Sequence, residues 1–551
     1  MRLYWRIILS LGLLCQSPLH AQLKFVMEDF EGLGVEQEDF KKEGLFAFGG
    51  VKLEVDKQHT IGYGYSGDRA LKVVWKEQKS FGGWGKGLTM HINLNPSEDF
   101  LNFYVLAPKA NNRTANVKIS IQEDDNGNSV FDENNDDEWI SKYAIEATGE
   151  WTFVSIPLSS FEDGNKGGDG KFNVGYNEGK LLTLIMTFTD EKLLQPKEEW
   201  YFDFLSFSKG KLPTWTGKFS PPPIDPENHC FLGVWSEEGN EGNPLEIPYR
   251  FENIFKDKSD KKMGIVHFFI PFAVGGAKGK NLYPMPDRIN WLIGKGYVPM
   301  ITLEHQYVKA RSNEKQPNLY SIIEGHFDYL FTEWAKRIKN VQGVVLLRIL
   351  HEFNGDWYPW CISKNDNNPE LYVKAYKRIH DIFMQQNATN VRFIWCPNST
   401  SYPQESWNDI MKAYPGDEYV DYVGLDVYNG AGQNSVPVWV SFRKEAAANY
   451  FILTQKCPTK PLLICEISSR ERKNVERGTM QDKATWIAQM SEALKSDFSK
   501  VTLISWFNQY DRFKITSSKE ATEAYLKYIL NDKHFRSGKE GFLQNDVIGK
   551  N

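Results

Sequence analysis

The sequence predicts two domains, an all-β sandwich followed by an α/β barrel of eight β/α units, a TIM barrel. Strand-like runs up to about residue 210 follow one another without helical patterns between them. From residue 229 onward, strand-like runs alternate with helical stretches. A chain of 551 residues is also too long for one ordinary core. The change of pattern therefore marks a domain boundary.

Residues 23–210 form the predicted sandwich. Short apolar runs bounded by turn residues are typical of antiparallel strands packed in two sheets. These runs cover residues 70–75, 100–107, 115–122, 150–158, 180–188 and 200–208. The next segment, 211–228, contains three consecutive prolines, Pro221 to Pro223, which stiffen the backbone. We therefore expect a linker at 211–228.

Residues 229–540 form the predicted barrel, because they contain eight strand-like runs separated by helical stretches such as 321–340 and 370–386. The runs cover residues 230–235, 264–271, 297–304, 344–350, 391–397, 420–428, 461–467 and 501–507. An open, doubly wound sheet is the alternative. No glycine-rich phosphate loop follows any of the strands, which favours the barrel.

The first 21 residues have the pattern of a signal peptide. Arg2 and Arg6 precede an apolar run, and the small residue Ala21 provides a cleavage site. We therefore expect an exported protein, secreted or periplasmic. A lipid-anchored form through Cys15 is the alternative, which the preceding leucine disfavours. No later segment is long and apolar enough to predict a transmembrane span.

Charge and cysteine content bound the class of protein. A net charge of -6 gives no electrostatic basis for binding nucleic acid. Aromatic residues make up 14% of the chain, which suits stacking on the faces of sugar rings. Five of the six cysteines follow the leader, and none has the CxxC spacing of a zinc site. We expect one disulfide or none.

Two glutamates stand at the ends of predicted barrel strands, Glu352 after the fourth and Glu466 after the seventh. Active sites of this fold lie at the carboxyl ends of the strands. Salt bridges, Glu352 with Arg348 or Glu466 with Arg470, are the structural alternative. Two opposed carboxyl groups about 5 Å apart are typical of retaining glycoside hydrolysis. We therefore predict Glu352 as the acid/base and Glu466 as the nucleophile.

Four segments near strand ends resemble glycoside hydrolase family 26, whose members include β-mannanases, mixed-linkage β-glucanases and β-1,3-xylanases. They are HEFNGDWYPW (351–360), YVDYVGLDVYN (419–429), PLLICEIS (461–468) and LISWFNQ (503–509). The resemblance spans about residues 228–535. It implies a retaining (β/α)8 enzyme with the same two glutamates in the same roles.

The resemblance also implies roles for two histidines and a tyrosine. His351 and His305 are expected to contact the sugar, and Tyr428 is expected to form a hydrogen bond with Glu466. For His305, a structural histidine is the alternative. Packing at the rim of the barrel is the alternative for Tyr428.

Three tryptophans complete the implied site. Trp506 is expected to be the platform under the sugar, with Trp357 and Trp360 lining the cleft, although core packing is the alternative for Trp360. Typical mannanases have two further aromatics where this chain has Tyr358-Pro359, and often a basic residue where it has Phe507. These differences leave the backbone sugar open.

The resulting expectation is an endo-acting enzyme on β-1,4-mannan, with mixed-linkage β-glucan or β-1,3-xylan as alternatives. Two further hypotheses are a non-catalytic glycan-binding protein on a degenerate barrel and a transglycosylase that uses the same acids. We expect a polysaccharide or oligosaccharide partner, a monomer, and no cofactor for catalysis.

The N-terminal domain resembles carbohydrate-binding modules whose first and last strands share a calcium site. By that resemblance, Glu28 in VMEDFEG and Asp203 in WYFDFLSFS are expected to be structural calcium ligands. The acidic segment 123–139 does not fit an EF-hand loop, and we expect a solvated loop there rather than a calcium cage. A role in bracing the barrel is the alternative to glycan binding.

Overall fold

A computed structural model describes most of the chain. It covers residues 21–34, 37–59, 69–76, 81–109, 114–165, 167–175, 179–189, 197–212, 229–237, 244–430, 439–472 and 481–537. The expected signal peptide, apart from Ala21, and the expected linker, apart from its first two residues, lie outside these ranges. Within the described ranges, no helix has the length and hydrophobicity needed to cross a membrane.

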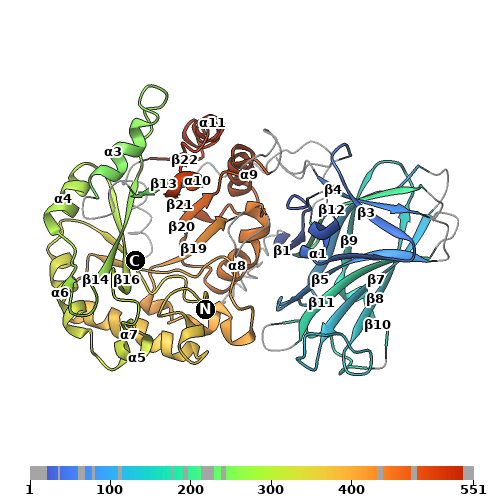
Figure 1. The fold of residues 1–551 in the computed structure, drawn as a ribbon, viewed down its shortest axis with the longest axis horizontal. Coiled ribbons are helices and arrows are strands. Elements are labelled where there is room, and N and C mark those ends of the chain that lie inside the picture. Colours follow the sequence, from blue (N-terminus) through green and yellow to red (C-terminus); the bar gives the residue numbers. More distant parts are fainter. Residues whose placement is uncertain are drawn as a thin grey trace, which may run out of the picture.

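The N-terminal domain is a sandwich of two antiparallel sheets (Figure 1). One sheet has the order β3 (Val51–Asp56), β4 (Ala70–Trp75), β12 (Glu199–Lys209), β6 (Asp99–Leu106) and β9 (Trp151–Pro157), with β1 (Gln22–Glu28) also paired to β12. The other has the order β10 (Glu162–Asp163), β8 (Glu138–Glu146), β7 (Thr114–Asp124), β11 (Lys180–Phe188), β5 (Gly82–Met90) and β2 (Leu45–Phe48). A short helix, α1 (Gln37–Lys42), precedes β2.

The C-terminal domain is a closed barrel of eight parallel strands, which confirms the predicted fold class. The strands are β13 (Cys230–Ser236), β14 (Ile265–Val274), β16 (Val298–Val308), β17 (Val345–Ile349), β18 (Val391–Trp395), β19 (Tyr422–Asn429), β20 (Leu462–Ser469) and β21 (Val501–Asn508). The eighth strand pairs with the first, so no edge stays open. Two short strands, β15 (Lys280–Asn281) and β22 (Phe535–Arg536), extend the sheet.

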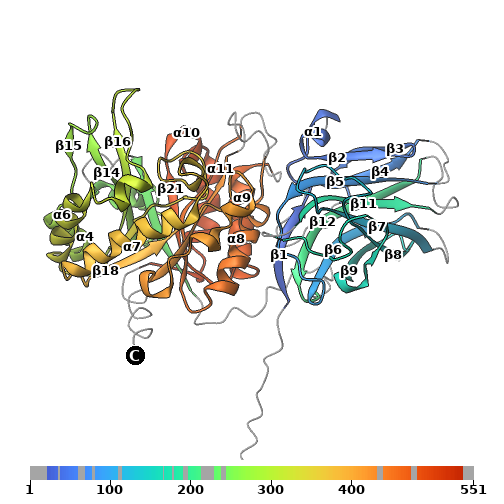
Figure 2. The same ribbon diagram turned by 90° about the horizontal axis from the view of Figure 1, so that it is seen from below.

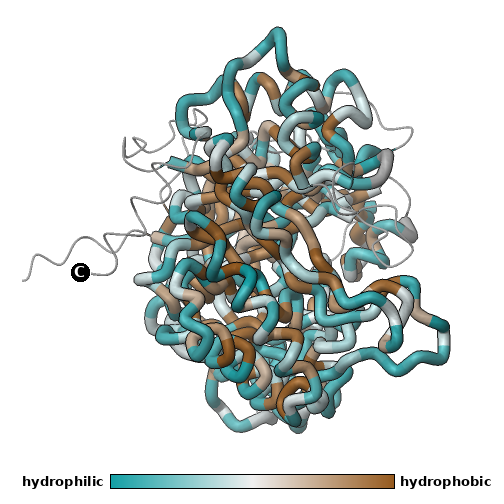
Figure 3. Tube along the Cα trace, turned by 90° about the vertical axis from the view of Figure 1, so that its left-hand side faces the viewer, coloured by the Kyte–Doolittle hydropathy of each residue, from teal (hydrophilic) through white to brown (hydrophobic). Residues whose placement is uncertain are grey.

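Helices surround the barrel strands. They are α3 (Glu246–Asn253), α4 (Pro286–Gly294), α5 (Leu319–Ile323), α6 (Asp328–Lys339), α7 (Pro369–Gln385), α8 (Phe442–Lys456), α9 (Lys483–Lys495), α10 (Tyr510–Phe513) and α11 (Lys519–Tyr525). Seen from the barrel side, hydrophobic segments gather in the middle and hydrophilic segments surround them (Figure 3). This arrangement buries the apolar stripe of each helix against the strands.

Strand β1 lies against helix α8 of the barrel, so it joins the two domains (Figures 1 and 2). Its side chains Phe25 and Met27 belong to the sandwich core, whereas Leu23 and Val26 belong to the barrel core. The register of β1 against β12 is irregular at two points, which lets the side chains of one strand pack into the cores of both domains. Apolar contacts therefore hold the sandwich against the barrel.

Glu28, at the end of β1, is buried between two ammonium groups. Lys86 of β5 lies 2.5 Å from its Oε2, and Lys444 of α8 lies 3.1 Å from both carboxylate oxygens. Glu43 lies 3.4 Å from each of the same lysines. Burial alone would raise the pKa of Glu28, but the charges of Lys444 and Lys86 lower it to about 2. This ion cluster connects the two domains.

We expect the Lys444→Met variant to lose about 3–5 kcal/mol of stability, because Glu28 would lose one of its two buried cations. Urea denaturation of the intact chain, followed by tryptophan fluorescence, measures the loss. The double variant Glu28→Gln/Lys444→Met removes the unpaired charge as well and should recover part of the stability. Equal losses in the single and double variants would contradict the role of this ion pair.

Candidate active site

The backbone turns abruptly where β17 ends. Leu350 and Glu352 both have left-handed backbone conformations, with φ of 48° and 50°. Such angles are costly for residues other than glycine, and they persist where the surrounding structure fixes them. The amide of Glu352 donates a 2.8 Å hydrogen bond to the carbonyl of Cys396, which follows β18. The turn thus holds the Glu352 side chain at the carboxyl end of the barrel strands.

Glu352 is buried and has one close polar contact. Its side chain accepts a 2.7 Å hydrogen bond from the indole Nε1 of Trp357. Burial, followed by the charge of Glu466, raises the pKa of Glu352 to about 8, although Trp357 and Arg348 act in the opposite direction. Glu352 is therefore protonated at neutral pH, the form that a general acid requires.

Glu466 accepts hydrogen bonds at both carboxylate oxygens. Arg348 donates from Nη2 to Oε1, and the hydroxyl of Tyr428 donates to Oε2. Both contacts fix the orientation of the carboxylate. Arg348 also pairs with Asp426, donating from Nη1 to Oδ1 at 2.8 Å and to Oδ2 at 2.6 Å. Arg348 thus pairs with Glu466 and Asp426, not with Glu352 as the salt-bridge alternative suggested.

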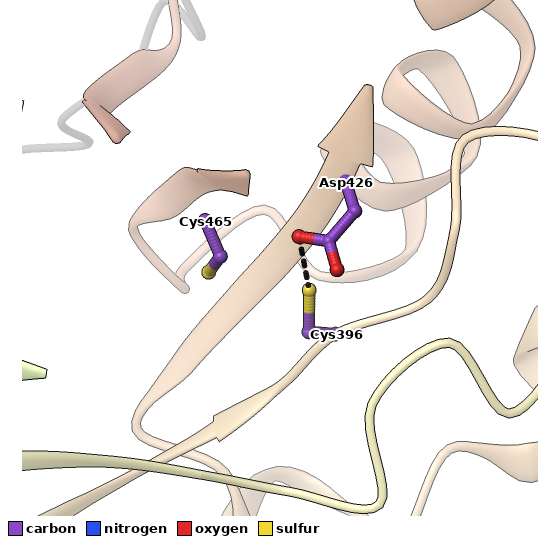
Figure 4. Close-up of side chains that lie close together, drawn as sticks. All are labelled: Cys396, Asp426 and Cys465. Carbon is purple, nitrogen blue, oxygen red and sulfur yellow. Dashed lines mark hydrogen bonds between the residues drawn. The ribbon is translucent and has the colours of Figure 1, made fainter. Parts of the chain in front are cut away.

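Asp426 lies together with two cysteines. Cys396 donates a 3.3 Å hydrogen bond to Asp426, and Cys465 lies beside them (Figure 4). The three residues are close enough to share a metal ion. However, Arg348 already supplies the positive charge to Asp426, and burial raises the pKa of the Cys396 thiol well above its ordinary value. These features favour packing over metal binding.

Gly424 makes room for the two thiols. A Cβ atom at this position would lie 2.8 Å from the sulfur of Cys396 and 3.0 Å from that of Cys465. All five described cysteines are free and buried.

His351 and Trp360 lie behind the surface of the site. Both are fully buried, and Trp360 stacks on Tyr358 with ring centroids 4.3 Å apart. The indole of Trp360 donates a 2.6 Å hydrogen bond to the carbonyl of His351, and the His351 ring packs 4.8 Å from that of Tyr358. The expected sugar contacts of His351 and Trp360 are therefore not available in this structure. Trp357, with 47% of its surface exposed, is accessible.

His305 is a structural residue in this arrangement. Its ring is fully buried among Phe272, Phe331 and Trp360. Burial lowers its pKa to about 3, so the imidazole is neutral. The expected contact between His305 and a substrate is therefore corrected to a packing role.

Trp506 also faces away from the barrel interior. The ring is fully buried, lies 5.5 Å from Tyr525 of α11 and has the Lys483 ammonium 5.5 Å above it. The neighbouring residue, Phe507, stacks on Trp235 at 4.3 Å and lies 5.4 Å from Tyr428. Because side chains alternate along a strand, Phe507 takes the inward position. The expectation of a platform at Trp506 is therefore wrong.

Sequence reasoning missed the parts played by Arg348, Asp426 and Glu304. Glu304, near the end of β16, is largely buried, and burial followed by the Glu466 charge raises its pKa to about 7 although Gln306 donates a 3.0 Å hydrogen bond to it. One signal in the sequence could have predicted these contacts. Arg348 is a lone charged residue inside an apolar strand, and such a residue needs a partner of opposite charge in the barrel interior.

The predicted calcium ligands Glu28 and Asp203 do not fit a shared metal site. Two lysines already surround Glu28 with positive charge. Asp203 accepts a 2.7 Å hydrogen bond from the amide of Phe204, and it lines a small cavity with Asp29 and Glu31. A divalent cation at Glu28 would have to displace both ammonium groups, so the contacts give the calcium role no support and it stays a prediction.

Two family models match the two domains. Residues 272–502 match "Glycosyl hydrolase family 26", and residues 34–195 match "Carbohydrate binding domain 30". Endoglucanase H of Acetivibrio thermocellus is 32% identical over 286 residues, which are 50% of this chain and 28% of that protein.

Other relatives are named as mannan-degrading enzymes. A mannan endo-1,4-beta-mannosidase of Bacillus subtilis is 31% identical over 133 residues, covering 22% of this chain and 35% of that protein. The chain thus spans about a third or less of these curated relatives. A solved ruminal GH26 endo-beta-1,4-mannanase shares 15% identity, with a TM-score of 0.41 over 87% of this chain and 92% of that one.

We expect the stability of the Glu352→Gln variant, relative to the parent chain, to be greater at pH 8 than at pH 5 by about 3.5 kcal/mol. The pKa of Glu352 rises from 4.5 to about 8 on folding. Stability from the bound proton is therefore complete below pH 4.5 and is lost as the pH rises toward 8. Glutamine cannot ionise, so the variant avoids this loss.

Urea denaturation at both pH values measures the difference. Glu28→Gln is the matched control. In the parent chain, the pKa of Glu28 is lowered to about 2, so this carboxylate should contribute the same stability at pH 5 and pH 8. A Glu352→Gln effect that does not change between the two pH values would contradict the raised pKa.

Proposed function

We propose that the chain is a retaining endo-β-glycanase, because residues 272–502 match glycosyl hydrolase family 26 and residues 34–195 match carbohydrate binding domain 30. In this proposal, Glu352 is the acid/base and Glu466 is the nucleophile. The observation that carries it is the different environment of the two acids. Glu352 is protonated at neutral pH, whereas Glu466 receives hydrogen bonds from Arg348 and Tyr428.

The first step of the proposed reaction transfers the sugar to the enzyme. Glu352 gives its proton to the glycosidic oxygen as the bond to the anomeric carbon breaks, and the Glu466 carboxylate attacks that carbon from the opposite face. The products are the shortened leaving chain and a glycosyl ester of Glu466. The indole of Trp357 orients the Glu352 carboxyl group for this transfer.

The second step releases the sugar with its β configuration restored. Ester formation removes the negative charge of Glu466, which is one of the causes of the raised pKa of Glu352. The pKa of Glu352 therefore falls in the intermediate. Glu352 then accepts a proton from a water molecule, which attacks the anomeric carbon and displaces Glu466.

The proposed substrate is a β-1,4-linked polysaccharide, with mannan first. This choice is supported by the curated relatives named mannan endo-1,4-beta-mannosidase. A β-glucan is the second candidate, because the relative that matches 286 residues is named Endoglucanase H. Hydrolysis of mannan, carboxymethyl cellulose, lichenan and β-1,3-xylan, followed by chromatography of the products, separates these candidates.

The remaining parts of the proposal concern the sandwich and the site of action. A carbohydrate binding domain supports attachment to polysaccharide. Export to the periplasm or the medium is proposed from the N-terminal leader pattern alone. The reaction as proposed uses side chains of the barrel and needs no cofactor.

Replacing either acid should lower kcat by a factor on the order of 10³, because both steps of the reaction use both acids. Azide distinguishes their roles on an aryl β-glycoside. In Glu466→Ala, azide takes the place of the nucleophile and should give the α-glycosyl azide. In Glu352→Ala, azide attacks the glycosyl ester and should give the β-glycosyl azide. Both products are identified by proton NMR.

Glu252→Gln is the matched control for these variants. Glu252 is a partly buried carboxyl group bonded to Met263 and Tyr297 at the opposite end of the barrel strands. Its replacement should leave kcat within about twofold, because a change remote from the site alters neither acid. Reversed azide products would exchange the two roles, and undiminished activity of Glu466→Ala would contradict the nucleophile.

We expect kcat/KM to fall as the pH rises through about 8, because the free enzyme then loses the proton of Glu352. The hydrogen bond from Trp357 lowers the pKa of Glu352. In Trp357→Phe, this alkaline limb should therefore move to higher pH. A pH profile of kcat/KM on a soluble substrate measures the shift. Movement of the limb to lower pH would contradict the assignment of Glu352 as the acid.

A further inference from the structure

Three carboxyl groups converge in the sandwich, far from the proposed active site in the sequence. Glu123 lies in β7, Asp125 follows it, and Asp137 immediately precedes β8. One carboxylate oxygen from each residue lies within 4.8 Å of the other two. Glu123 and Asp137 are buried, and Asp125 is half-buried. The acidic segment therefore folds back on itself and is not simply solvated.

Two of these carboxylates have an oxygen without a partner. Asp125 Oδ2 accepts a 2.9 Å hydrogen bond from the amide of Asp137, and Asp137 Oδ2 accepts one of 2.9 Å from the amide of Gly170. The Oδ1 atoms of both residues are buried and accept no hydrogen bond in the structure. Asp137 has no exposed surface at all. Leaving anionic oxygens in this state is costly without a cation.

No cation within the described residues is paired with this cluster. The charges that act on Glu123 and Asp125 come from other aspartates, and together with burial they raise the pKa of Glu123 to about 8 and that of Asp125 to about 6. The contrast with Glu28 is direct, since two lysines accompany that buried carboxylate. A free cation would supply the missing charge.

The backbone of a second loop closes over the cluster. Gly168 has φ of 67°, and a Cβ atom there would lie 2.1 Å from Asp137 Oδ1 and 2.7 Å from Asp125 Oδ2. Only glycine allows the chain to approach the carboxylates so closely. On the same side, the amide of Asn173 donates a 3.3 Å hydrogen bond to Glu123, and the Asn173 side-chain oxygen is buried without a partner.

We propose that Glu123, Asp125 and Asp137 bind one Ca²⁺ ion. The donors are all oxygen atoms and come from loops as well as from a strand, which suits Ca²⁺ better than zinc or the stricter octahedral Mg²⁺. The Asn173 side-chain oxygen, which has no hydrogen-bond partner among the described residues, is a candidate for a further donor. The ion would fix the 124–137 segment against the loop that contains Gly168. The proposal is independent of which reaction the barrel performs.

Terbium luminescence tests the site directly, because Tb³⁺ replaces Ca²⁺ and is excited by energy transfer from a nearby indole. Trp139 provides that indole, since its Nε1 donates a 3.1 Å hydrogen bond to Glu123. We expect saturable emission from one Tb³⁺ per chain that Ca²⁺ displaces. The emission should be lost in Asp137→Asn and in Asp125→Asn, and kept in the control Asp203→Asn.

Thermal unfolding provides a second readout. Ca²⁺ at 100 times its Kd should raise the Tm of the sandwich transition by about 5 °C in the parent chain and not in Asp137→Asn. In EDTA, Asp137→Asn should unfold no earlier than the parent, because it removes a buried carboxylate that has an unpartnered oxygen in the described part of the chain. This comparison identifies a variant that has simply misfolded.

Three results would overturn the proposal. One is the absence of both Tb³⁺ emission and a Ca²⁺-dependent Tm shift in the parent chain. Another is emission that persists in Asp137→Asn. The third is emission that Asp203→Asn abolishes while Asp137→Asn does not, which would return the calcium site to the first and last strands of the sandwich.

Discussion

One buried cation, the guanidinium of Arg348, joins the acids at the carboxyl end of the barrel. It pairs with Asp426 and Glu466, which come from two other strands. A single positive charge in a low-dielectric interior stabilises a limited number of anions. Glu352 lies close to the same group without a hydrogen bond to it, and burial keeps its proton bound. The two catalytic candidates therefore differ in their contacts, because Glu466 pairs with the guanidinium and Glu352 does not.

The same constraint explains the rest of the site. Tyr428 and Trp357 each donate one hydrogen bond to one acid, so each carboxyl group has a fixed orientation. The aromatic stack of Tyr358 on Trp360 fills the volume behind them and excludes water from His351. Exclusion of water strengthens the electrostatic interactions among the remaining charges. Packing and electrostatics thus act on the same few side chains.

Buried carboxylates in the sandwich also depend on a nearby positive charge, and the groups differ in whether they have one. Glu28 has two lysines, one from each domain, and so becomes part of the contact between them. Within the described residues, Glu123, Asp125 and Asp137 have raised pKa values and lack such lysines. An acidic motif in a sequence can therefore become an ion pair or a cation site, and the partner that tertiary structure brings to it decides which.

Much of the architecture was determined by the sequence alone. Short apolar runs predicted all eight barrel strands and the antiparallel sandwich, because such a pattern depends on a few neighbouring residues. Glu352 and Glu466 could be singled out because strand ends are visible in the sequence. Tertiary structure decided which pairs meet and which way each side chain points. Trp506 and Phe507 are adjacent, yet only Phe507 faces the barrel interior. Contacts such as Arg348 with Asp426 join residues 78 positions apart, and local patterns carry no information about such distances.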